Sequence, residues 1–475
     1  MANPNILSER YATKEINAIF SEEGKIIAER ELWIAVMKAQ RQLGADIPAA
    51  DIAKYERAVR KIDLQRITQI ESKTKHDVKA RIEAFVEAAG AKEHIHKGMT
   101  SRDLTDNVEQ VQIKKASKII FGKYISILRH MAERSAEYRN IVLTARTHHQ
   151  PAQPTLLGRR FAMWAEELYL HAGDFERRLG EYPLRGIKGP AGTQFDMLNL
   201  LGSEKKVRKL EEKIAKQLGF SKVLEATGQV YPRSLDYSLI SGLSRLASAC
   251  ENFAKGMRLM SGFELVTEGF RKGQVGSSAM PHKMNTRSSE RICGFAELLK
   301  MHADGASRLS GDQWEEGDVS CSVVRRVIIP DSLYASDGLC ETTLTVLNGM
   351  GAYPEMAGQE LERYLPFLAT TEIMMAAVKK GIGRERAHKI IKRYAVSEAL
   401  KMRQGGKSPE IAKRLSRDPE FQKAGISEDE INRILQEKAH FTGLAEKQIK
   451  SVNAKISNMT KKYRKEAKYE PAAIL

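Results

Sequence analysis

Cysteines and long apolar runs are scarce in this chain, and each scarcity excludes a class of protein. Only 4 of 475 residues are cysteines, and they are scattered (Cys250, Cys293, Cys321 and Cys340). Such a set does not suit a disulfide framework or a zinc site, so we expect reduced, mostly buried thiols. No stretch approaches the ~18 apolar residues that span a bilayer. The opening MANPNILSERYATKE lacks the apolar core of a signal peptide, so we expect a cytoplasmic protein without a membrane partner.

Basic residues outnumber acidic residues in this chain. The chain has 77 basic and 60 acidic residues, a formal net charge of +17. This excess favours an anionic partner, which could be nucleic acid, acidic lipid or a phosphorylated and carboxylated metabolite. Much of it lies in amphipathic stretches such as KKVRKLEEKIAKQLG, where a solvated helix face is the simpler explanation. Charge alone leaves the kind of partner open.

Helical periodicity dominates the chain, whereas alternating β-type runs are nearly absent. One apolar stripe advances by three and four positions over about 26 residues, which predicts a helix about 39 Å long. Long helices bury such stripes best against one another, so we expect an all-α fold with an extended bundle as its core. The stripes are Leu235, Leu239, Leu243, Leu246, Cys250, Phe253, Met257 and Met260; Ile120, Tyr124, Ile127 and Met131; Val78, Ile82, Phe85 and Val86; and Leu157, Phe161, Trp164 and Leu168.

Two interruptions of this pattern indicate domain limits, in a chain longer than the roughly 250 to 300 residues that one core supports. The first is the polar segment HKGMTSRDLTDN, residues 96–107, and the second lies near Leu365 and Pro366. We therefore predict an N-terminal helical domain over residues 1–111, a central long-helix bundle over 112–364 and a C-terminal helical domain over 365–475.

One internal segment, EGFRKGQVGSSAMPHKMNTR at residues 268–287, has glycines and polar residues but no apolar stripe. Irregular segments of this length within compact proteins are often functional, and its glycines suit a hinge. Asn285 or Thr286 is expected to cap the helix that resumes at Ser288. A plain surface connection is the alternative, but the density of Ser, His, Lys and Asn makes it the weaker one.

Four polar clusters carry the side chains suited to chemistry: KTKHD (residues 73–77), HKGMTSRD (96–103), RTHHQPAQPT (146–155) and GSSAMPHKMN (276–285). Each could be a simple helix cap, but together their imidazoles, hydroxyls, amides and lysine suit proton transfer and the binding of an oxyanion in one cleft. His148 and His149 are adjacent, a poor arrangement for binding one metal, and no carboxylate or thiolate completes a site with His94 and His96. We expect no metal and no organic cofactor.

The cluster GSSAMPHKMN resembles the signature loop of the fumarase and aspartase superfamily, whose usual form is GSSxMPxKxN. RTHHQPAQPT resembles the second conserved block of this superfamily. KTKHD, HKGMTSRDLTDN, SERYATKEINAIFSEE and TGQVYPRSLD are similar to segments of the superfamily branch that cleaves adenylosuccinate. The resemblance covers essentially the whole chain. It implies a three-domain fold with a central long-helix bundle, and a homotetramer whose active sites each collect residues from three subunits.

The resemblance also implies a β-elimination. Fumarate would leave adenylosuccinate, giving AMP, and would leave the succinocarboxamide ribotide SAICAR, giving AICAR. On this basis Ser277 is the general base, with Lys283 stabilising its anion, and His148 is the general acid, oriented by Glu290. His149 is the rival acid if the alignment slips by one position.

The same resemblance assigns further residues to substrate binding. Asn285, with Lys283, would hold the succinyl carboxylates, and His76 would contact the phosphate or the succinyl group. Arg10 and Tyr11 would hold the 5′-phosphate. The complete predicted binding set is Arg10, Tyr11, His76, Asp77, Thr100, Ser101, Gln229, Asn285, Arg291, Ser322 and Arg326.

Two positions depart from the superfamily pattern. Thr286 follows the loop asparagine where a proline is usual, so the start of the next helix is set less rigidly. Gly317 stands where many relatives have an arginine directed at the nucleotide, and Arg325 and Arg326 are the candidates to replace it. Three alternatives remain: another lyase such as argininosuccinate lyase, fumarase or a cycloisomerase; a helical protein that binds nucleic acid; and a catalytically inactive relative.

Overall fold

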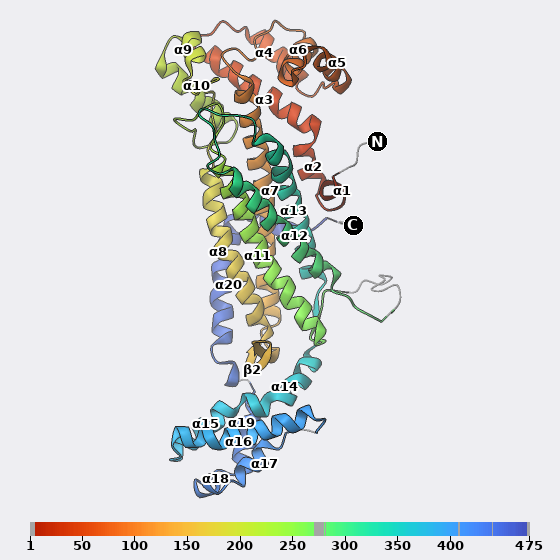
Figure 1. Ribbon diagram of the computed structural model, residues 1–475, viewed down its shortest axis with the longest axis vertical. Coiled ribbons are helices and arrows are strands. Elements are labelled where there is room, and N and C mark those ends of the chain that lie inside the picture. Colours follow the sequence, from red (N-terminus) through yellow and green to blue (C-terminus); the bar gives the residue numbers. More distant parts are fainter. Residues whose placement is uncertain (1–4, 270–279, 281, 407–408, 439, 473–475) are drawn as a thin grey trace.

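The computed structural model describes residues 5–269, 280, 282–406, 409–438 and 440–472. Long helices run side by side through most of the molecule, as Figure 1 shows. They are α7 (Ser101–Glu137), α8 (Leu157–Glu181), α11 (Ser234–Gly262), α12 (Arg287–Leu309), α13 (Ser322–Gly349) and α20 (Ala445–Lys462). The expected all-α fold with an extended bundle is confirmed.

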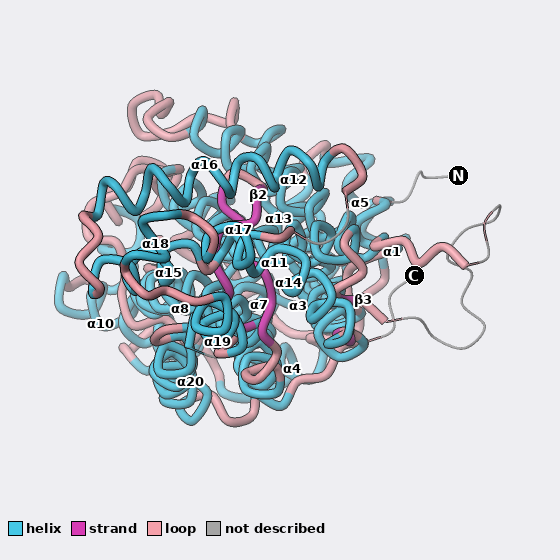
Figure 2. The backbone as a smooth tube through the Cα atoms, turned by 90° about the horizontal axis from the view of Figure 1, so that it is seen from below, coloured by secondary structure: helices cyan, strands magenta, loops and turns pink. Residues whose placement is uncertain are grey.

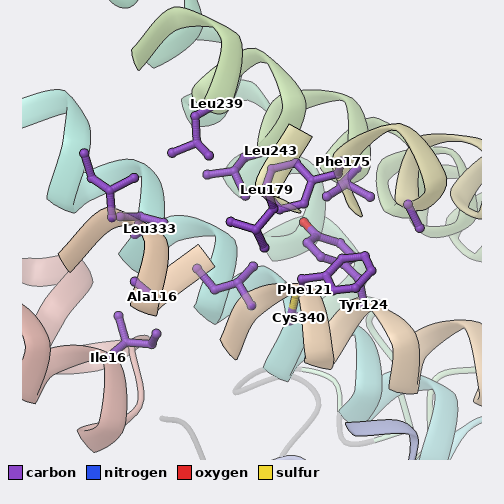
Figure 3. Close-up of a cluster of buried hydrophobic side chains, with 14 of the residues drawn as sticks. Ile16, Ala116, Phe121, Tyr124, Phe175, Leu179, Leu239, Leu243, Leu333 and Cys340 are labelled. Carbon is purple, nitrogen blue, oxygen red and sulfur yellow. The ribbon is translucent and has the colours of Figure 1, made fainter. Parts of the chain in front are cut away.

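The apolar stripes form the core of this bundle. On α11, Leu243, Cys250 and Phe253 have no exposed surface, and Tyr124 on α7 has none either. Figure 3 shows such side chains from several helices meeting in one cluster. The periodicity predicted these burials because a helix of 3.6 residues per turn places every third or fourth residue on one face.

Shorter helices cover one end of the bundle, at the top of Figure 1. They are α3 (Glu22–Gln42), α4 (Ala49–Ala58), α5 (Leu64–Thr74), α6 (Asp77–Ala89), α9 (Phe195–Leu201) and α10 (Glu204–Gln217). Two further helices, α1 (Ile6–Arg10) and α2 (Lys14–Phe20), lie against α13. The start of α7 contacts the loop between α8 and α9, since Asn107 Nδ2 donates to Gly186 O at 2.8 Å.

The opposite end carries a second group of helices with a separate apolar core, built around Ile373, Leu415 and Phe421. These helices are α14 (Pro354–Leu368), α15 (Thr370–Lys379), α16 (Arg384–Arg403), α17 (Ile411–Ser416), α18 (Pro419–Lys423) and α19 (Glu428–Gln436). The chain then returns to the bundle, because α20 packs on α7 and α8, and Ile449 and Ile456 join the main core. The segment 365–475 thus contacts both cores, and α7 runs unbroken across residues 111 and 112. The domain limits stay predictions.

In the part of the chain that the structure describes, two small antiparallel pairs of strands interrupt the helices, drawn in magenta in Figure 2. One pair is β1 (Val142–Thr147) with β2 (Gln150–Leu156), and the other is β3 (Val266–Thr267) with β4 (Gly351–Ala352). The first hairpin contains the cluster RTHHQPAQPT, for which the sequence predicted no strands. Its prolines and polar residues hide the strand signal, because Pro151 and Pro154 cannot donate to a ladder.

Candidate active site

A cavity of ≈ 250 Å³ brings together two of the polar clusters that the sequence singled out, KTKHD and HKGMTSRD, with two residues that the resemblance assigned, Ser322 and Arg326. It lies where α3, α6, α7 and α13 meet. Five predicted binding residues line it, namely His76, Asp77, Ser101, Ser322 and Arg326, and the other lining residues are Lys25, Val78, Arg102, Thr105, Glu109 and Arg325. Residues far apart in the sequence thus line one cavity.

Three helix N-termini converge on this cavity. His76 is the N-cap residue of α6, and its Nδ1 accepts a hydrogen bond from Lys79 N at 3.3 Å. Ser101 is the first residue of α7, and Ser322 is the first residue of α13. A helix N-terminus carries unpaired N–H groups and a partial positive charge, so all three ends favour an anion in the cavity.

A buried carboxylate fixes the start of α7. Asp103 has no exposed side-chain surface, and its Oδ2 accepts from Thr100 N at 2.8 Å, which completes a capping box. Its Oδ1 accepts from Arg185 Nη1 at 2.5 Å and from Lys188 N at 2.8 Å. These hydrogen bonds to the Asp103 carboxylate hold the backbone of Thr100 and Ser101 in place.

Arg325 belongs to the wall of the cavity. Its side chain is 3% exposed, its Nε donates to Asp236 at 2.7 Å, and its Nη1 lies 2.8 Å from Glu109 Oε2. These two carboxylates neutralise the guanidinium. Of the two arginines considered as replacements at Gly317, Arg326 is thus the one left exposed to the cavity.

Gly317 itself could not carry an arginine in this backbone without strain. Its φ is +141°, and an added Cβ would lie 2.9 Å from Val230 Cγ2. The neighbouring residue is tied to the predicted binding residue Gln229, whose N–H donates to Glu316 O at 2.6 Å. Close packing of residues 228–230 against 316–317 accounts for glycine at this position.

Tyr11, which follows α1, and Arg291 of α12 form a second group, and Arg10 is the last residue of α1. The Tyr11 ring meets Phe295 edge to face with 5.1 Å between centroids, and the Arg291 guanidinium lies 5.5 Å from the centroid of the Tyr11 ring. Close by in the chain, Thr13 N donates to Asp337 Oδ2 at 2.7 Å. The N-terminal segment is thereby anchored to the bundle, while the Arg10 side chain is exposed.

Lys283 lines a separate cavity of ≈ 450 Å³ at the base of the segment 268–287, together with His282, Thr267 and Tyr353. Asn285 is close by in the chain, and Glu290 is an exposed residue early in α12. Ser277, the predicted base, lies outside the described residues.

The helix that follows this segment is capped differently from the expectation. It begins at Arg287, and Thr286 occupies the N-cap position without a side-chain capping bond. Instead, Glu268 accepts hydrogen bonds from Ser288 N at 2.9 Å and Ser289 N at 3.0 Å. Thr286 thus holds one of the two expected cap positions, but its side chain does not cap the helix, because a carboxylate from the other end of the segment satisfies these N–H groups and ties the two ends together.

The predicted acid, His148, occupies the turn of the hairpin between β1 and β2. His148 and His149 have φ values of +51° and +61°, the backbone of a type I′ turn, and both residues are exposed. The ring of His149 lies 5.7 Å from Phe263 and lines a third cavity, of ≈ 620 Å³. Arg146 forms an ion pair with Glu360 and lies over the Phe263 ring, 4.1 Å from its centroid.

The predicted residues therefore fall into separate groups at different positions along the helix bundle of one chain. Ser101 begins α7, and His148 follows the other end of this 37-residue helix, which is about 54 Å long. In a single chain these two side chains cannot contact one small substrate.

Sequence reasoning missed several residues that line the first cavity: Lys25, Arg102, Thr105 and Glu109. Arg102 lay inside the singled-out cluster HKGMTSRD, so its place in that cluster was the available signal. Thr105 lay in the longer singled-out segment HKGMTSRDLTDN, whereas Lys25 and Glu109 lie within helices, where they look like ordinary solvated positions.

In the described ranges, no helix has an apolar stretch long enough to cross a bilayer. Within the same ranges, no three His, Cys, Asp or Glu side chains are grouped so that they could hold a metal ion.

Comparison with known proteins places the chain in a family. The family described as Lyase matches residues 10–297, and the one described as Adenylosuccinate lyase C-terminus matches residues 366–452. The chain is 33% identical to the adenylosuccinate lyase of Saccharomyces cerevisiae, over 97% of this chain and 96% of the yeast protein. It is 32% identical to the adenylosuccinate lyase of Schizosaccharomyces pombe, over 95% of this chain and 94% of that protein.

Among solved structures, the crystal structure of 3-carboxy-cis,cis-muconate lactonizing enzyme from Pseudomonas putida superposes with a TM-score of 0.81 at 18% identity. It covers 96% of this chain and 100% of that chain, and the likeness shows the fold. Fold and sequence together define an enzyme, a helical lyase of the fumarase and aspartase superfamily. Within it, the chain belongs to the adenylosuccinate lyase family, so the branch that the sequence predicted is confirmed.

Proposed function

We propose that this chain releases fumarate from adenylosuccinate, leaving AMP, and from SAICAR, leaving AICAR, in purine nucleotide synthesis. The observation that carries the proposal is the first cavity, where His76, Ser101, Ser322 and Arg326 meet at three helix N-termini. Such a site suits an oxyanion of a phosphorylated or carboxylated substrate.

The proposed chemistry divides proton transfer between two residues. Ser277 takes the proton from the succinyl carbon beside a carboxylate, and Lys283 and backbone N–H groups stabilise the serine anion that this requires. His148 protonates the departing nitrogen, and Glu290 orients its imidazole. Lys283 and Asn285 hold the succinyl carboxylates, so that the charge that develops on one of them meets fixed donors.

The length of the bundle supports an active site shared between subunits. Because Ser101 begins α7 and His148 lies in the hairpin that follows its other end, a site that uses both must take them from different copies of the chain. We propose a homotetramer whose sites each collect residues from three subunits.

Exposed apolar side chains on two faces of the bundle support this assembly. On α8 and α11, Leu170 is 64% exposed and Leu259 is 54% exposed. On α12 and α13, Met301 is 67% exposed and Val323 is 75% exposed. Exposed apolar side chains on long helices are the kind of surface that neighbouring subunits bury. The proposed compartment is the cytoplasm.

The test combines two inactive variants. Ser277→Ala and His148→Ala should each lower kcat for adenylosuccinate by at least ~100-fold without changing the far-ultraviolet circular dichroism, since each removes a proton-transfer group. Unchanged kcat in either variant would contradict its assigned role.

Subunit mixing then tests the shared site. His148→Ala and Ser101→Ala subunits are unfolded together, refolded as mixed oligomers and assayed. If the two residues come from different chains, roughly a quarter of the sites contain both intact residues and activity returns. Each variant refolded alone is the control. Absence of recovery in verified mixed oligomers would contradict sharing.

A further inference from the structure

Arg102 is held in a fixed orientation at the edge of the first cavity. Its Nη1 lies 3.3 Å from Asp106 Oδ1, and its Nη2 donates to Ser322 Oγ at 3.3 Å. Its side chain is 16% exposed, and it lines the cavity. A guanidinium has five N–H donors, so these two long hydrogen bonds leave donors for another acceptor.

The charges around Arg102 leave the cavity cationic. Its lining contains Lys25, Arg102, Arg325 and Arg326 against the carboxylates of Asp77 and Glu109. Arg325 is already neutralised by Glu109 and Asp236. This leaves two arginines and one lysine facing one carboxylate.

The carboxylate behind Arg102 does not neutralise it fully. Asp106 has no exposed side-chain surface and also lies 3.2 Å from Arg233 Nη2. It accepts a further hydrogen bond from Tyr231 N at 3.2 Å. One carboxylate shared by two guanidinium groups positions Arg102 and leaves it with net positive charge toward the cavity.

We infer that Arg102 binds an oxyanion of the substrate directly, its guanidinium donating into the cavity beside Ser322, with Lys25 as a second cation. The inference deepens the proposed function, on which it rests for the identity of the substrate. Phosphate and carboxylate share the recognised chemistry, because the planar guanidinium can give two parallel hydrogen bonds to either. Ser322 then has two roles, because its oxygen accepts a hydrogen bond from Arg102 and its O–H donates one to the anion.

The first experiment measures steady-state kinetics of the full-length oligomer. Arg102→Gln should raise KM for adenylosuccinate at least tenfold, which corresponds to about 1.4 kcal/mol, while kcat changes less than threefold. Arg102→Lys keeps the positive charge but loses the paired N–H donors of the guanidinium, and should give a smaller increase in KM. The matched control is Arg66→Gln, which removes an exposed arginine of α5 that pairs with Glu87. It should leave both constants unchanged.

Competitive inhibition identifies which oxyanion Arg102 binds. A rise in Ki for AMP with an unchanged Ki for fumarate assigns Arg102 to the phosphate, and the reverse result assigns it to a carboxylate. Changes of less than twofold in KM and in both Ki values would overturn the inference. So would a loss confined to kcat, since that result would place Arg102 outside ground-state binding.

Binding measurements, which need no turnover, distinguish a failure of this inference from a failure of the proposed function. Calorimetric titration of AMP and of fumarate into wild type and Arg102→Gln reports affinity even if adenylosuccinate is not cleaved. If Arg102→Gln does not fold, Arg102→Lys and Lys25→Gln carry the test. Wild-type affinities for both anions in both of these variants would overturn the inference.

Discussion

Asp103→Asn tests how the fold positions the site. The carboxylate of Asp103 and the guanidinium of Arg185 are both fully buried, with 2.5 Å between Oδ1 and Nη1. Asparagine has nearly the same volume but no charge, so Arg185 would remain buried without a counter-ion. Breaking a buried ion pair by removing one partner costs about 3–5 kcal/mol.

The measurement is urea unfolding followed by circular dichroism at fixed protein concentration. Asp103→Asn should lower the unfolding free energy by about 3–5 kcal/mol and raise KM, because one amide oxygen cannot accept from both Thr100 N and Lys188 N, so the start of α7 shifts. The control is Asp63→Asn, the same change at an exposed helix cap that accepts from Arg66 N at 2.9 Å, where a loss of at most ~1 kcal/mol is expected. A loss in Asp103→Asn no larger than in the control would refute the reasoning.

Three further predictions concern the loop base, the pH response and the core. Glu268→Gln should lower kcat more than it raises KM and destabilise the start of α12 by about 0.5–2 kcal/mol. Wild-type kinetics in this variant would show that the hydrogen bonds from Ser288 and Ser289 to Glu268 do not serve the site. Burial lowers the pKa of the His96 imidazole, whose Nδ1 accepts from Trp33 Nε1 at 3.1 Å. As the pH drops through the unfolded-state pKa of about 6.5, the unfolded chain binds a proton that the folded chain does not, so stability falls. Between about pH 7.5 and 5.5 the thermal midpoint of His96→Gln should therefore fall less than that of the wild type. Equal slopes of thermal midpoint against pH in the two proteins would contradict this. Lys123→Met leaves two buried carboxylates, one of them Asp337, without their cation and should cost about 3–5 kcal/mol in urea unfolding; a cost below about 1 kcal/mol would show that the cation is dispensable.

The helices could be predicted from the sequence because their signal is local. The stripe from Leu239 to Met260 repeats with the period of a helix, and every such residue faces the core of the bundle. The hairpin of β1 and β2 could not be predicted in this way. Its strands pair through contacts across the turn at His148 and His149, and two positive φ values at histidines leave no pattern in the sequence.

The content of the first cavity was partly predictable, since the clusters with His76 and Ser101 contained groups suited to an anion, whereas only the resemblance indicated Ser322. Their convergence depends on how α6, α7 and α13 pack, which is a long-range property. The ion pair between Arg325 and Asp236 and the capping of α12 by Glu268 also join residues that are far apart in the sequence. A sequence shows that a charged side chain is present but not which distant carboxylate or N–H group it meets.

The most direct test of the assigned activity is the absorbance change when purified protein is mixed with adenylosuccinate in the presence of EDTA. Elimination carried out by Ser277 and His148 predicts stoichiometric formation of AMP and fumarate under these conditions. No turnover of adenylosuccinate, together with turnover of argininosuccinate or malate by the same preparation, would contradict it.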